Sequence, residues 1–130
     1  MTARTREGHL TWYVINYYGG FMTKAEWLAH RTFMTEFKAQ NGPPEFREMI
    51  ERHFTDACQE PPWTSDPEAL SLMNDGVEVF LRRVRDRILR EHQNSVVLNC
   101  CPKCGGLAKT PTAQQCQWCF YAWHQPGRDP

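Results

Sequence analysis

Four cysteines near the carboxyl end of the sequence have the spacing of metal ligands. Cys101 and Cys104 form one Cys-x-x-Cys pair, Cys116 and Cys119 form a second, and eleven residues separate the two pairs. Two residues between cysteines allow a tight turn to present both thiolates to one cation, and two facing turns complete a tetrahedron. Because four thiolates leave no coordination position open, the spacing predicts a structural rather than a catalytic zinc ion. Iron in the same four-thiolate cage is the alternative metal.

The same cysteines have two other interpretations, as redox-active pairs or as structural disulfides. A redox-active Cys-x-x-Cys opens a helix within a βαβ unit, and nothing before Cys101 or Cys116 provides that context. Residues 1–8 include basic side chains but no apolar core behind them, so the sequence indicates no secretory signal. We therefore expect a cytoplasmic protein whose cysteines are reduced and bind metal.

The cysteine segment resembles a zinc ribbon over about residues 96–124. The resemblance depends on the four cysteines, on Pro102, which stiffens the first turn, and on Gly105, which accepts a positive φ after it. Phe120 stands in the second turn where ribbons commonly have glycine. The resemblance implies a bound structural zinc ion, and the sequence predicts short strands around the turns at 96–98, 107–109 and 120–123.

The plan of the whole chain, a short helical body followed by this ribbon, also resembles small bacterial proteins, but no activity follows from that likeness. Two further cysteines are predicted to bind no metal. Cys100 directly precedes a ligand, so on a short strand its side chain points to the opposite face. Cys58 is most simply a small buried hydrophobic residue.

Aromatic side chains crowd the second cysteine pair and are the first candidates for an interaction surface: Trp118, Tyr121 and Trp123, with Phe120 between them. They have two interpretations. The rings dock the ribbon onto the helical body, or they form an exposed platform that stacks on bases or on the side chains of a partner protein.

An arginine-rich run at 82–90 is the second candidate surface. On a helix, Arg83, Arg87 and Arg90 share one sector and could form a stripe that contacts phosphates. The competing interpretation is a solvated face with internal ion pairs, because residues 43–75 contain eight acidic and only two basic side chains.

The composition excludes several function classes. The chain has 130 residues, about one domain's worth, with fifteen basic and fifteen acidic side chains. It therefore lacks the overall positive field of proteins that bind nucleic acid without selectivity. No apolar stretch is long enough to span a membrane. No Ser-His-Asp signature, phosphate-binding glycine loop or His-Glu-x-x-His motif is present, so the sequence indicates neither a catalytic site nor a small-molecule substrate.

The elements predicted to carry these residues are mainly α-helical: a bundle of about four helices followed by the small β ribbon. Thr23 and Glu26 form a capping box that starts the second helix, and residues 41–44 end it. Gly76 breaks the last helical segment into two parts. The predicted helices span 9–18, 24–40, 44–57 and, with the break, 67–92.

Three apolar stripes are predicted to be buried. The helix at 24–40 contributes Ala29, Phe33 and Phe37. The third helix contributes Phe46, Met49, Ile50 and Phe54, with His53 among them as a hydrogen-bonded core histidine rather than a catalytic one. The last helix contributes Val77, Phe80, Leu81, Val84 and Ile88.

Together these observations predict tails at 1–8 and 125–130, a helical domain at 9–95 and the zinc ribbon at 96–124. The expected function is that of a non-catalytic zinc-binding module that docks a protein partner. The alternative is a nucleic-acid-binding accessory or regulatory factor that uses the 82–90 run and the ribbon aromatics.

Overall fold

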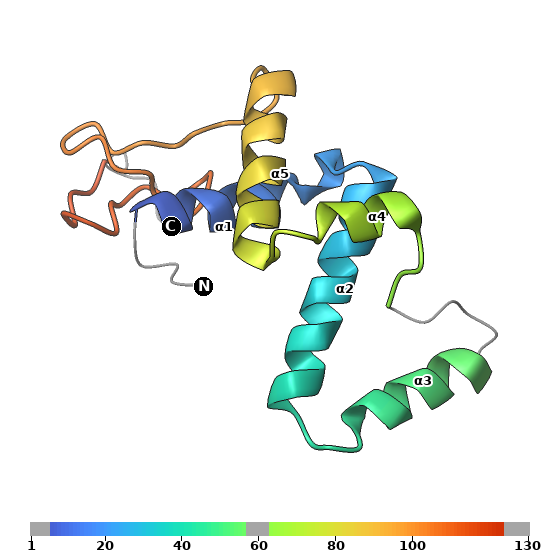
Figure 1. Ribbon diagram of the computed structural model, residues 1–130. Helices are drawn as coiled ribbons and strands as arrows, with labels where there is room; N and C mark the ends of the chain where they lie inside the picture. Colours follow the sequence, from blue (N-terminus) through green and yellow to red (C-terminus); the bar gives the residue numbers. More distant parts are fainter. Residues whose placement is uncertain (1–5, 57–62, 124–130) are drawn as a thin grey trace. The chain divides into compact units, whose positions relative to one another are not determined.

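The computed structural model describes residues 6–56 and 63–123, which fold mainly as α-helix (Figure 1). The prediction of a mainly helical chain is confirmed, although five α-helices form within the described residues rather than about four. No helix there is both long and apolar enough to cross a membrane. The helices are α1 (Arg6–Tyr18), α2 (Lys24–Asn41), α3 (Phe46–Asp56), α4 (Pro67–Leu72) and α5 (Val77–Glu91), with a 3-10 helix η1 (Gly19–Phe21) after α1.

The chain forms two compact units. One unit spans Met22–Leu81 and contains α2, α3, α4 and the beginning of α5. The other combines Met1–Phe21 with Arg82–Pro130, so it contains α1, η1, the rest of α5 and the cysteine segment. The cysteine segment therefore shares its unit with the helix from the opposite end of the sequence.

Side chains cap α2 and α4 of the Met22–Leu81 unit, and the predicted capping box is confirmed. The Thr23 hydroxyl accepts from the Glu26 N–H at 3.1 Å, and the Glu26 carboxylate accepts from the Thr23 N–H at 2.9 Å. Asp66 caps α4 by accepting from the Ala69 N–H at 2.9 Å. Both caps satisfy backbone donors that a helix leaves free at its start.

The packing of α2 against α4 forms the core of this unit. Ala29 and Ala69 are fully buried, and their small side chains allow the helices to approach closely. The Thr32 hydroxyl accepts from the Thr64 N–H at 3.0 Å and so joins the segment before α4 to α2. The Phe33 ring lies 5.4 Å from that of Phe80 at the start of α5.

The predicted burial of α3 is wrong, although the helix itself is confirmed. None of its described side chains is buried, Met49 is 56% exposed, and His53 is exposed with its ring against Phe54. On α2, the predicted core residue Phe37 is 64% exposed. The periodic pattern identified a helix correctly, but it says nothing about whether another element covers the apolar face.

The break at Gly76 and the buried stripe of α5 are both confirmed. Gly76 has φ 89°, a left-handed conformation that glycine adopts without a steric penalty, and it separates α4 from α5. Four of the five predicted stripe residues are buried: Phe80, Leu81, Val84 and Ile88.

Two arginines of the 82–90 run attach α5 to the amino-terminal segment. Arg85 is only 7% exposed and donates to the Thr11 hydroxyl of α1 at 2.9 Å. Arg87 donates to the Phe21 carbonyl of η1 at 2.8 Å, and the Phe21 ring stacks on His92 at 4.2 Å. Part of this charge run is therefore structural.

The predicted strands of the ribbon are not present in the residues that the structure describes. Within residues 92–123 the backbone makes two isolated antiparallel bridges, Cys100 with Leu107 and Gln115 with Ala122, and no strand. Each bridge closes a turn around two cysteines, and the pairing extends no further along the chain. The predicted tails lie mostly outside the described residues, except that α1 begins at Arg6 rather than at His9.

Replacing Ile88 by alanine is expected to destabilise the protein by about 2–5 kcal/mol, because the side chain is fully buried and its loss leaves a cavity. Urea unfolding followed by circular dichroism measures the effect. The exposed Met49→Ala is the control and should change stability by no more than about 0.5 kcal/mol. Equal destabilisation by both variants would contradict the assignment of Ile88 to the core.

Candidate metal centre

The first turn, residues 101–106, is a closed hairpin that we call the first knuckle. The Cys101 N–H donates to the Gly106 carbonyl at 2.8 Å, and the Gly105 N–H donates to the Cys101 carbonyl at 2.9 Å. The bridge between Cys100 and Leu107 lies directly outside this pair. Backbone hydrogen bonds therefore close the hairpin that carries these two cysteines.

The second turn, residues 116–121, repeats the same pattern and is called the second knuckle. The Cys116 N–H donates to the Tyr121 carbonyl at 2.8 Å, and the Phe120 N–H donates to the Cys116 carbonyl at 3.1 Å. The bridge between Gln115 and Ala122 again lies directly outside. The two knuckles thus have the same pattern of backbone hydrogen bonds at equivalent positions.

The two knuckles also share a left-handed residue. Gly105 has φ 75°, as predicted, and Phe120 at the equivalent position of the second knuckle has φ 65°. A left-handed conformation costs a residue with a Cβ about 1–2 kcal/mol relative to glycine. The second knuckle therefore has the same turn as the first despite its phenylalanine.

Backbone N–H groups point at the sulfur atoms. Cys101 Sγ accepts from the N–H groups of Lys103 and Cys104, at 3.3 and 3.4 Å. Cys116 Sγ accepts from Trp118 and Cys119 at the same two distances. These donors stabilise negative charge on sulfur, which is the form that binds a metal.

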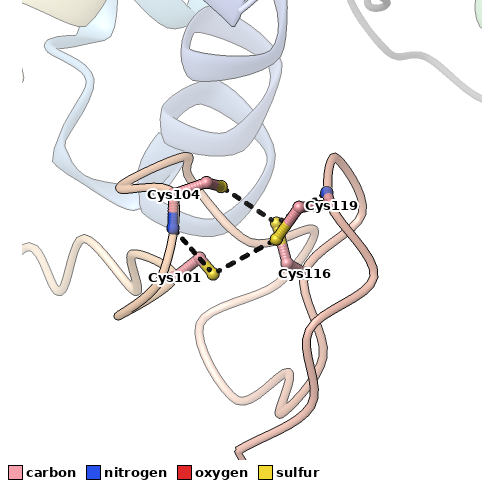
Figure 2. A group of neighbouring side chains, drawn as sticks. All are labelled: Cys101, Cys104, Cys116 and Cys119. Carbon is pink, nitrogen blue, oxygen red and sulfur yellow. Dashed lines mark hydrogen bonds between the residues drawn. The ribbon is translucent and has the colours of Figure 1, made fainter.

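The four sulfur atoms converge on one point (Figure 2). All of them lie within 4.8 Å of one another; Cys101 and Cys119 are 3.7 Å apart, and Cys104 and Cys116 are 3.5 Å apart. A tetrahedron with metal–sulfur bonds of about 2.3 Å has edges of about 3.8 Å. The separations exceed a disulfide bond of about 2.05 Å, and all four thiols are free. The four cysteines lie close together and could hold a metal ion.

The thiols differ in acidity. Burial raises the pKa of Cys116, but the N–H groups of Cys119 and Trp118 outweigh it and bring the pKa to about 6. The Tyr121 N–H lowers the pKa of Cys119, but burial and the neighbouring thiols outweigh it and raise the pKa to about 11. Without metal, the cluster therefore holds part of its negative charge and retains at least one proton that a cation would displace.

Helix α1 supports the knuckles through two buried side chains. His9 is buried, and its Nε2 donates to the Ala108 carbonyl directly after the first knuckle at 2.9 Å. Tyr13 is fully buried, and its hydroxyl donates to the Val97 carbonyl before that knuckle. Because both sides of the knuckle are attached to one helix face, the cysteines hold a fixed position relative to α1.

Trp118 packs inside this unit. Its indole N–H donates to the Leu107 carbonyl at 2.9 Å, its ring meets His9 edge-on at 5.9 Å, and the Arg6 guanidinium lies 5.5 Å from its centroid. A Cβ on Gly106 would stand 2.5 Å from the Trp118 ring, so this glycine is needed for the close approach. Trp118 therefore links the two knuckles and α1.

Asn99 has a supporting role that the sequence did not indicate. The Asn99 side-chain amide donates to the carbonyls of Thr110 and Ala113, at 3.0 and 2.8 Å. The Asn99 backbone carbonyl accepts from the Ala108 N–H. These bonds hold the loop that separates the knuckles. A single asparagine carries no pattern that predicts such contacts.

The other predicted aromatic residues lie at the surface of the second knuckle. Tyr121 is 41% exposed, its ring stacks on Trp123 at 6.5 Å, and the Lys103 ammonium lies 5.7 Å from its centroid. Phe120, which lies within the same aromatic group, is 72% exposed. The sequence marks Phe120 as unusual, because ribbons commonly have glycine at this position.

The three arginines of the predicted stripe are not equivalent. Arg83 and Arg90 are exposed, whereas Arg87 binds the Phe21 carbonyl and pairs with Glu91 at 3.0 Å. Arg90 lies 4.0 Å from the same Glu91 carboxylate.

The two remaining cysteines stay outside the cluster. Cys100 has an exposed thiol that does not belong to the group of four sulfur atoms. Cys58 lies outside the described residues.

The chain matches no family model, no curated protein and no solved structure. The candidate metal site is therefore recognised from its own geometry: two matching knuckles, four sulfur atoms within 4.8 Å of one another, and backbone donors aimed at the sulfur atoms.

Replacing Cys104 or Cys119 by serine is expected to abolish metal retention, because each change removes one of the four sulfur ligands. Helix content measured by circular dichroism should stay largely unchanged, since α2, α3 and α4 lie in the other unit. Elemental analysis of the purified variants gives the metal stoichiometry. Cys100→Ser is the matched control and should retain its metal. Full stoichiometry in both ligand variants would contradict the proposed ligand set.

Metal binding at pH 7.5 is expected to release at least one proton per ion. Cys119, with its pKa raised to about 11, is protonated at that pH and must lose its proton to become a ligand. Calorimetric titration of the metal-free protein in two buffers of different ionisation enthalpy measures the released protons. A binding enthalpy that is identical in both buffers would refute the expectation.

Proposed function

We propose that the four-cysteine centre binds a structural zinc ion. Two of the sulfur separations, 3.7 and 3.5 Å, are close to the edge of a tetrahedron with metal–sulfur bonds of about 2.3 Å. Four protein sulfur atoms would fill the tetrahedron and leave no position for water or substrate. Iron fits the same cage and is the competing metal. A four-thiolate iron site absorbs visible light and zinc does not, so the spectrum of freshly purified protein separates the two.

We further propose that the metal module acts by docking a protein partner rather than by catalysis. The observation that supports this is Phe120, which is 72% exposed although its φ is 65°. Glycine, as in the first knuckle, is the relaxed choice at this position, and the phenylalanine ring buries little against its own chain. A strained residue with an exposed apolar side chain is best explained by a contact outside the molecule.

The surroundings of Phe120 favour a protein over a nucleic acid. Tyr121 beside it extends the exposed aromatic surface, and Lys103 is the cation near that ring. Four thiolates around a divalent cation leave the centre with two formal negative charges, which repel phosphates. Arg87, the middle residue of the candidate phosphate stripe, is held by Phe21 and Glu91.

We also propose that the protein acts in the cytoplasm, because four ligand thiols must stay reduced to bind metal. Secreted proteins of this size commonly convert such thiols to disulfides.

The variant Phe120→Gly tests the docking proposal without damaging the fold. It is expected to keep its zinc and to be as stable as the natural protein or more stable by about 1 kcal/mol, since glycine relieves the positive φ. Affinity capture from cells of the source, with nuclease treatment, should lose the partner that the natural protein retains. Phe37→Ala is the control, because it removes another largely exposed phenylalanine from the other unit and should retain that partner.

Two outcomes would contradict the proposal. Retention of the same partner by Phe120→Gly would remove the second knuckle from the interface. Capture that disappears on nuclease treatment, and that weakens when Arg83 and Arg90 are changed to alanine, would favour the nucleic-acid alternative.

A further inference from the structure

Helix α3 has an apolar face that no element of the described residues buries. Its large apolar side chains recur at helical spacing on one side of the helix: Phe46, Met49, Ile50 and Phe54. None of the four is buried, and Met49 is 56% exposed. A helix of 11 residues gains most of its stability by packing such a face against another surface. The face therefore calls for a partner outside the described chain.

Arg47 joins α3 to the rest of the Met22–Leu81 unit. Its guanidinium lies 3.4 Å from the Glu36 carboxylate of α2 and 4.5 Å from the centroid of the Trp63 ring. At 100° per residue Arg47 stands beside the apolar face rather than within it. Figure 1 shows α3 diverging from α2 beyond the turn that joins the two helices. This attachment leaves the face accessible.

Charged residues flank the face with the signs that a second copy of the same helix requires. Glu45 and Arg52 lie on one flank. Arg47 and Glu51 lie on the other. When two copies of one helix pack antiparallel about a two-fold axis, each flank meets the same flank of the second copy, and its first residue meets its last. Opposite charges therefore meet on both flanks.

The same arrangement brings the two apolar faces together. The midpoint of each flanking pair falls at or next to Met49, which lies near the centre of the face. We propose that α3 binds the same helix of a second copy of this chain, antiparallel and through this face. Met49 then packs against Met49 and Ile50 of the second copy, and Phe46 packs against the half of the face that carries Phe54.

The charge of the whole unit sets the strength of this contact. Residues 22–81 contain eleven acidic and five basic side chains, so two copies of the unit repel each other at long range. At physiological salt the Debye length is about 8 Å, which screens this repulsion more than it screens ion pairs in contact. Two helices of this length form a small interface, so we expect a weak dimer with a Kd on the order of 0.1 mM.

Sedimentation equilibrium of the full-length, metal-loaded protein tests this proposal. In reducing buffer with about 0.15 M NaCl, the average mass should rise from one chain toward two as the protein concentration passes about 0.1 mM. The reducing agent prevents disulfide dimers through the exposed Cys100. Met49→Glu should abolish the association, because it places a charge at the centre of the contact.

Two controls separate this contact from other surfaces. Leu70→Glu adds the same charge at another exposed apolar position, on α4 of the same unit, and should leave the association unchanged. Phe120→Gly should also leave it unchanged, because the proposed docking surface lies in the other unit. Circular dichroism should give the same helix content for every variant.

An exchange of charges tests the antiparallel arrangement. Arg52→Glu and Glu45→Lys should each weaken the association about tenfold, because each change replaces two ion pairs by contacts between like charges. The variant that carries both changes restores opposite charges across the contact and should recover most of the natural affinity.

Three results would overturn the proposal. The first is a mass of one chain at every concentration, which would leave the α3 face to a different protein. The second is unchanged association in Met49→Glu, or lost association in Phe120→Gly, either of which would place the contact elsewhere. The third is a double charge variant that associates as weakly as the single variants, which would exclude the antiparallel arrangement.

Discussion

The convergence of four cysteine sulfur atoms is the constraint on which the carboxyl-terminal module depends. Thiolates at 3.5–3.7 Å repel one another unless a cation lies among them, and backbone N–H groups offset only part of that repulsion. The module has no strands and few fully buried side chains in its described residues, so little else holds its two knuckles together. A bound ion would therefore supply much of its folding free energy.

The module is also held from outside by α1. Buried His9 and Tyr13 bond carbonyls on either side of the first knuckle, and Trp118 of the second knuckle packs against His9. Arg85 of α5 reaches Thr11 of α1 and closes the unit. This support explains how two short hairpins keep a fixed orientation, and it leaves Phe120 and Tyr121 facing solvent.

Features that depend on neighbouring residues could be predicted from the sequence. The knuckle cysteines, Gly105 and the Thr23 capping box follow from spacing over a few residues, and the stripe of α5 follows from helical periodicity. Burial depends on distant elements, and there the predictions failed: α3 buries no described side chain, and Phe37 is exposed. Three further features depend on contacts between distant residues, which no local pattern records. They are the bond from Arg85 to Thr11, the bond from His9 to the Ala108 carbonyl, and the isolated bridges that stand in place of ribbon strands.

Zinc K-edge X-ray absorption on the purified, reduced protein tests the central claim most directly, because it reports both the identity of the metal and its ligands. The account predicts one zinc ion per chain, surrounded by four sulfur atoms at about 2.3 Å. A protein that contains no zinc, or zinc with nitrogen or oxygen ligands in its first shell, would contradict it.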